Sequence, residues 1–77
     1  MHIKILGTGC TKCIALENNV KEAVAQIGGF HQIEKVEDIM KIMEYNILST
    51  PGLVIDDKLI SAGKSYSVEQ LVTMLEG

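Results

Sequence analysis

The hydrophobic pattern changes its period once in the first half of the chain, and this change constrains the fold most. Residues 2–6 alternate polar and apolar side chains over most of their length, which is typical of a strand. From residue 13 to residue 27 the apolar positions recur at steps of three and four, which predicts an amphipathic helix ended by the glycine pair at 28–29. A second strand is predicted over residues 30–36, at a sheet edge where its polar side chains are tolerated. Two strands joined by such a helix favour a parallel pair with a right-handed crossover.

A short helix is predicted next. Two acidic residues at 37–38 mark its start, and Ile39, Ile42 and Met43 supply its apolar face up to residues 45–46. The default expectation for Met40, Met43 and Met74 is that they fill gaps in the core.

The chain then predicts a hairpin and a final helix. A strand over 53–55 is followed by a turn at 56–57, a returning strand over 58–61 and another turn at 62–64. Ser67 and Gln70 have the spacing of a capping box before the last helical pattern. The whole order, βαβαββα, predicts an α/β fold in which helices flank a mixed four-stranded sheet, in a single domain over residues 1–77.

The two cysteines stand at the junction of the first strand and the first helix, as Cys10-Thr11-Lys12-Cys13. A thiol at a helix N-terminus faces unpaired backbone N–H groups and the positive end of the helix dipole, and both favour the thiolate. A cation close by has the same effect, so we expect Lys12 to lower the pKa of Cys10 as well. The second sulfur lies one turn away on the same face, so the pair could close a disulfide or chelate a soft metal ion.

Composition excludes several classes of function. The 77 residues carry a net charge of −3 and no clustered Lys or Arg, which argues against nucleic-acid binding. No apolar run approaches the roughly 20 residues of a membrane span, and the N-terminal residues lack the features of a signal peptide. The expected compartment is the cytoplasm. In such a reducing environment a close cysteine pair is more often redox-active or metal-binding than structural.

Three features together resemble the thioredoxin superfamily, and most closely its small glutaredoxin-like, redox-active disulfide proteins. These features are the CxxC at the first strand-to-helix turn, Thr50-Pro51 directly before the third strand, and the closing hairpin and helix. The chain departs from the thioredoxin pattern in having no Trp and in carrying Lys4, with no acid, in the strand before the motif.

The resemblance implies a thiol–disulfide oxidoreductase in which Cys10 attacks and Cys13 resolves. It also implies that Pro51 is cis and packed against the disulfide, and that Thr50 offers its backbone to a bound substrate chain. The residues expected to contact substrate are Gly9, Thr11, Lys12, Thr50, Pro51 and Gly63. By the same analogy we expect no cofactor, a monomer, a disulfide-containing protein or small thiol as substrate, and a flavoprotein disulfide reductase as electron donor.

A soft-metal carrier is the main alternative, because two thiolates bind copper or zinc readily. Small heavy-metal-binding domains also place CxxC after the first strand, but their order is βαββαβ. This chain is predicted to end in a helix and carries Thr50-Pro51, and both features favour redox chemistry over metal transport.

Overall fold

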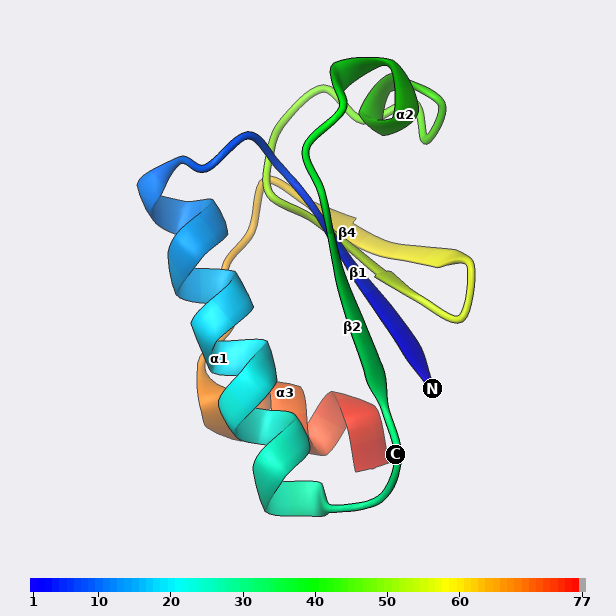
Figure 1. The fold of residues 1–77 in the computed structure, drawn as a ribbon. Coiled ribbons are helices and arrows are strands. Elements are labelled where there is room, and N and C mark those ends of the chain that lie inside the picture. Colours follow the sequence, from blue (N-terminus) through cyan, green and yellow to red (C-terminus); the bar gives the residue numbers. More distant parts are fainter. Residues whose placement is uncertain (77) are drawn as a thin grey trace.

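The computed structural model describes residues 1–76, which form one four-stranded sheet and three helices (Figure 1). The strands lie in the order β2-β1-β3-β4; β1 and β2 are parallel, and the other two pairs are antiparallel. The predicted element order, the parallel pair and the mixed sheet are therefore confirmed. The elements are β1 (His2–Leu6), α1 (Thr11–Ile27), β2 (Gln32–Val36), α2 (Ile39–Met43), β3 (Gly52–Ile55), β4 (Lys58–Ala62) and α3 (Val68–Glu76).

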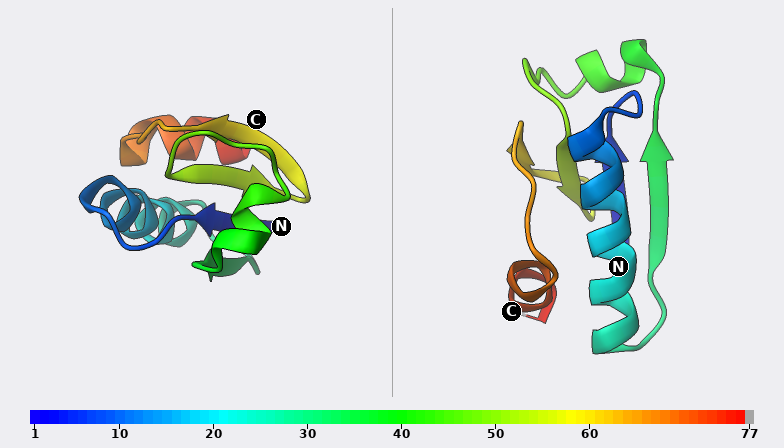
Figure 2. Two further views of the ribbon diagram at one scale, coloured as in Figure 1. Left: turned by 90° about the horizontal axis from the view of Figure 1, so that it is seen from above. Right: turned by 90° about the vertical axis from the view of Figure 1, so that its left-hand side faces the viewer.

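Helices α1 and α3 pack against each other and cover one face of the sheet, as the two views of Figure 2 show. The apolar periodicity of both helices faces this layer, and burial of that surface supplies most of the stabilising free energy. The main core consists of Ile3, Ile5, Leu16, Val20, Ala23, Leu53, Leu71 and Leu75.

The opposite face of the sheet is covered by α2 and the residues that follow it. This second, smaller core consists of Leu6, Val36, Ile42 and Val54, with Tyr45 and Ile47 packed against it. Since α2 has only five residues, a single buried side chain, Ile42, attaches it to the sheet.

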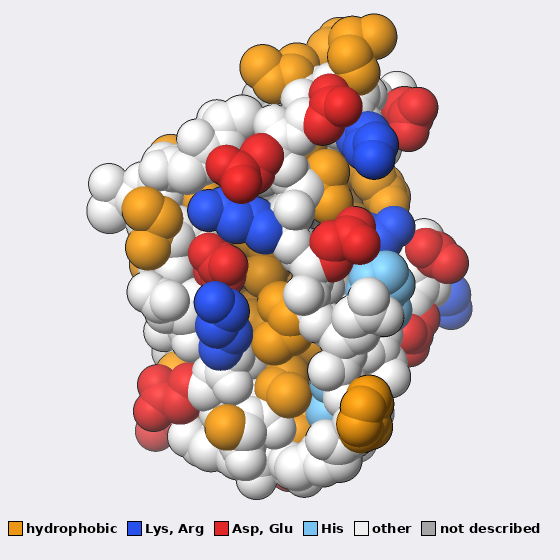
Figure 3. Space-filling view, in the orientation of Figure 1, with side chains coloured by type: hydrophobic (Ala, Val, Ile, Leu, Met, Phe, Trp, Pro, Cys, Tyr) orange, Lys and Arg blue, Asp and Glu red, His pale blue; other side chains and the backbone are white. Residues whose placement is uncertain are grey.

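The expectation that Met40 and Met43 fill the core is wrong, because the exposed fraction of Met40 is 73% and that of Met43 is 62%. Ile39 is also 60% exposed, so the predicted apolar face of this helix is buried only at Ile42. Figure 3 shows the resulting group of hydrophobic side chains on the surface over α2. Met74 is half-buried against the main core.

The second strand is shorter than predicted. It begins at Gln32, whose N–H donates to the carbonyl of Met1 at 3.0 Å, and Phe30 before it is fully exposed. Gly28 and Gly29, both with positive φ, end α1 and turn the chain, and pairing with β1 begins only after this turn. As predicted, β2 lies at an edge of the sheet.

The hairpin and the last helix form as the local sequence predicts. Asp56 and Asp57 both adopt positive φ, 49° and 68°, which is the backbone of a tight hairpin turn; Asp tolerates this conformation without glycine. The Ser67 N–H donates to Gln70 Oε1 at 3.0 Å and the Gln70 N–H donates to Ser67 Oγ at 3.2 Å, so the capping box is confirmed. None of the helices within residues 1–76 has the length and apolar character needed to cross a membrane.

Candidate active site

Three chain segments meet at one end of the sheet and form the candidate site. They are the turn from β1 into α1, the loop that enters β3, and the turn that leaves β4 (Figure 1). They meet there because β1 runs toward this end while the antiparallel β3 starts from it.

Cys10 caps the N-terminus of α1. Its backbone is extended, its carbonyl accepts the Ile14 N–H at 3.0 Å, and its Sγ accepts the Cys13 N–H at 3.3 Å. A sulfur in this position satisfies one of the free N–H donors of the first helical turn. The Cys10 residue is exposed, so its sulfur can meet a substrate disulfide.

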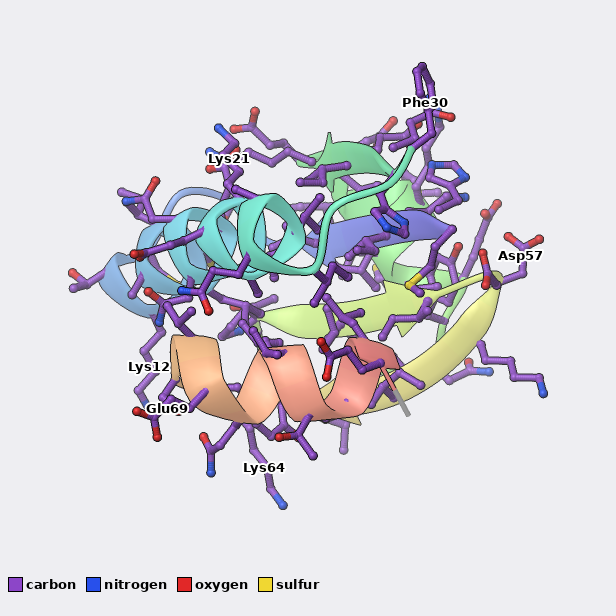
Figure 4. All side chains as sticks on the ribbon, turned by 90° about the horizontal axis from the view of Figure 1, so that it is seen from below. Lys12, Lys21, Phe30, Asp57, Lys64 and Glu69 are labelled. Carbon is purple, nitrogen blue, oxygen red and sulfur yellow. The ribbon has the colours of Figure 1, made fainter. Side chains whose placement is uncertain are left out.

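The hydrogen bonds around Cys10 hold the pKa of its thiol below the ordinary value. The Cys13 thiol makes the largest contribution, followed by the Cys13 N–H; the Thr50 side chain and the Lys12 N–H add smaller ones. Among the main causes of this lowered pKa, Lys12 acts through its backbone N–H and not through its ammonium group. Figure 4 shows the Lys12 side chain at the outer edge of the molecule. The expected electrostatic effect of the Lys12 side chain stays a prediction.

Cys13 lies beneath Cys10 and is fully buried. Burial raises the pKa of the Cys13 thiol, and its hydrogen bond to Cys10 raises this pKa further. The two thiols, both free, thus differ in the way a two-step exchange requires: Cys10 is exposed and has a lowered pKa, while Cys13 is buried and has a raised pKa.

The loop before β3 brings Thr50 and Pro51 to the thiols. The Thr50–Pro51 peptide bond is cis, as the resemblance implied, and Pro51 is buried. Hydrogen bonding by the Thr50 side chain lowers the pKa of both cysteines. The hydroxyl therefore faces the site, in addition to the backbone that the resemblance implied.

Gly63, in the turn after β4, lies against this loop. Its N–H donates to the Pro51 carbonyl at 2.8 Å, and a Cβ at position 63 would lie 2.8 Å from Ser49 Cβ. Gly63 has a φ of 77°, so both its conformation and its close approach require glycine.

The predicted site residues thus fall into two groups. Cys10, Cys13, Thr50, Pro51 and Gly63 come from three segments and meet at one end of the sheet. Gly9, Thr11 and Lys12 are exposed on the turn and on the first helical turn beside them.

Comparison with known proteins agrees with this arrangement. A sequence profile described as the thioredoxin domain matches residues 1–76. The chain is 37% identical over 75 residues to a thioredoxin from Methanothermobacter thermautotrophicus, covering 97% of each protein. It is 44% identical over 69 residues to a thioredoxin from Methanocaldococcus jannaschii, covering 90% of this chain and 79% of that protein. The chain belongs to the thioredoxin family.

Membership in the thioredoxin family, together with the Cys10–Cys13 spacing, supports a thiol–disulfide oxidoreductase function. A carrier that holds copper or zinc through the two thiolates alone stays the alternative function. Within the 76 described residues, no three or more His, Cys, Asp or Glu side chains gather closely enough to hold a metal ion.

Sequence reasoning missed two features of this thioredoxin-like site. One is the Thr50 hydroxyl, since only the backbone of this residue was expected to matter. The other is Gly7, which ends the first strand in the sequence pattern but in the structure is buried against Cys13. The only sequence signal for Gly7 is a glycine close before a cysteine pair, and such a glycine also has the simpler explanation of a turn.

Proposed function

We propose that this protein reduces disulfides with Cys10 as the attacking thiolate and Cys13 as the resolving thiol. The Cys10 thiolate attacks one sulfur of the substrate disulfide, which forms a mixed disulfide and releases the first substrate thiolate. Cys13 then loses its proton and attacks the Cys10 sulfur, which closes the Cys10–Cys13 disulfide and releases the second thiolate. Both released thiolates take up protons, and the substrate gains the two electrons that the cysteine pair loses.

The contrast in exposure between the two thiols carries this assignment. Cys10 is exposed and accepts the Cys13 N–H, whereas Cys13 is fully buried and its pKa is raised. A substrate disulfide in solution therefore meets Cys10 first. Cys13 can react only with a sulfur already held at Cys10.

The surface around Cys10 would bind the substrate. Gly9, Thr11 and Lys12 are exposed neighbours of Cys10 along the chain, and the Thr50–Pro51 loop, held by Gly63, lies at the same end of the sheet. The substrate is a disulfide-containing protein or small thiol compound, and a flavoprotein disulfide reductase returns the pair to the dithiol. The domain, residues 1–77, works as a monomer in the cytoplasm without a cofactor and with no membrane or nucleic-acid partner.

Single serine substitutions test the roles of the two cysteines. Cys13→Ser should accumulate a mixed disulfide with a synthetic peptide that contains one disulfide, because no thiol remains to resolve it. Cys10→Ser should not, since the buried Cys13 cannot reach the peptide. The adduct is measured by mass spectrometry after acid quenching, with the wild type as the control that releases the peptide. Equal trapping by both variants would contradict the assignment.

A further inference from the structure

The buried sulfur of Cys13 packs directly against the backbone of Gly7, in the space that a side chain at position 7 would occupy. A Cβ at position 7 would lie 2.3 Å from Cys13 Sγ, far closer than the two atoms can approach, and 3.1 Å from Cys13 Cβ, which is a tight contact. The φ of Gly7 is not in the left-handed region, where other glycines of this chain lie. The need for glycine at this position is therefore steric and concerns Cys13.

The backbone on both sides of this contact is held in place. The Gly7 N–H donates to the Val36 carbonyl at 2.9 Å, which ties residue 7 to the end of β2. Cys13 belongs to the first turns of α1, where its N–H donates to Cys10 Sγ. The clash between a side chain at position 7 and the Cys13 sulfur would thus be relieved most easily by rotation of Cys13 to another rotamer, which moves the sulfur from its present position.

The space beside Gly7 is also where the Cys13 sulfur meets Thr50. A Cβ at position 7 would lie 3.9 Å from Thr50 Cβ, and the Thr50 side chain lowers the pKa of both thiols. Rotation of the sulfur would change its position relative to both Thr50 and Cys10. Displacement of a reacting atom by about 1 Å can slow a reaction by about a hundredfold.

We propose that Gly7 is a positioning residue for the second step of disulfide exchange. By lacking a side chain, it holds the Cys13 sulfur where it can attack the Cys10 sulfur of the mixed disulfide. In that step the Cys10–Cys13 bond forms, the bond between Cys10 and the substrate breaks, and the substrate leaves as a thiolate that takes up a proton. The proposal rests on the assignment of Cys13 as the resolving thiol.

Gly7→Ala tests the proposal through the lifetime of the mixed disulfide. Reduced protein is mixed with the synthetic peptide disulfide, quenched with acid at intervals and analysed by mass. We expect the variant still to form the mixed disulfide, and to lose it about tenfold more slowly or worse. Val20→Ala is the matched control, because it disturbs the core about two turns further along α1, away from the thiols. The control should resolve the adduct at the wild-type rate, and wild-type resolution by Gly7→Ala would overturn the proposal.

A double-mutant cycle gives a second readout that is independent of turnover. In reduced protein, Gly7→Ala should lower the thermal unfolding midpoint more when residue 13 is Cys than when it is Ala, because the alanine lacks the sulfur that the new Cβ meets. An equal shift in both backgrounds would contradict the contact. If Gly7→Ala does not fold, folding of Gly7→Ala/Cys13→Ala supports the proposal and failure of both contradicts it. If only the role of Cys13 were wrong, the two serine variants would trap equally while the cycle would still show coupling.

Discussion

At the scale of single residues, the two thiols have opposite pKa shifts with different causes. Hydrogen bonds from Cys13 lower the pKa of Cys10, whereas burial raises the pKa of Cys13. The lowered pKa of Cys10 contributes stability above its unfolded-state value, and this contribution is lost as pH falls through the folded-state value. For Cys13 the contribution is present below the unfolded-state pKa and is lost as pH rises through the raised folded-state value.

Thr50→Val should raise the pKa of Cys10, because it keeps the branched shape of the side chain and removes the hydroxyl that bonds the sulfur. Lys12→Ala should have the smaller effect, since it leaves the backbone N–H of residue 12 in place. The pH dependence of iodoacetamide alkylation at Cys10, in reduced protein, measures both. A larger rise of the Cys10 pKa in Lys12→Ala than in Thr50→Val would mean that the ammonium group is the main cause of the lowered pKa, which would contradict this account.

At the scale of elements, prediction from sequence succeeds where a segment's own pattern decides its structure. Helix α1 has a long apolar periodicity, and α3 has both a periodicity and a capping box, so their existence follows from local sequence. The packing of the short helix α2 could not be predicted in this way, because a helical pattern of five residues does not show how much of its apolar face contacts the sheet. Only the packing of the folded chain selects Ile42 and leaves Met40 and Met43 exposed.

The single anchor of α2 leads to a prediction about stability. Ile42→Ala should lower the free energy of unfolding by about 2 kcal/mol or more, because it leaves a cavity in the smaller core. Met40→Gln should change it by about 0.5 kcal/mol or less, since the side chain is already in solvent. Urea denaturation of both reduced variants measures the difference. Equal losses would mean that Met40 contributes to the core after all.

At the scale of the whole molecule, the order of elements was enough to predict the mixed sheet and its parallel pair. The strand–helix–strand unit at the start requires a crossover, and the two strands of the later hairpin pair antiparallel with each other. The site was less predictable. The cysteine pair is visible in the sequence, but the cis bond before Pro51 came only from the family resemblance.

The remaining parts of the site depend on distances across the fold. Gly7 is six residues from Cys13 in the sequence, and Thr50 is 37 residues beyond it, yet both reach the same sulfur. Neither contact leaves a periodic or compositional signal in the chain. Such contacts become visible only when β1, α1 and the loop before β3 are assembled at one end of the sheet.

The central claim is that Cys10 and Cys13 form a working dithiol–disulfide pair, and a redox titration tests it most directly. Metal-free protein is equilibrated in dithiol buffers of defined potential, and free thiols are counted by alkylation and mass. We expect one reversible two-electron step between about −120 and −300 mV, with about 30 mV for each tenfold change in the ratio of oxidised to reduced protein. A chain whose two thiols form no reversible disulfide, and are protected only when copper or zinc is added, would contradict the claim and favour metal transport.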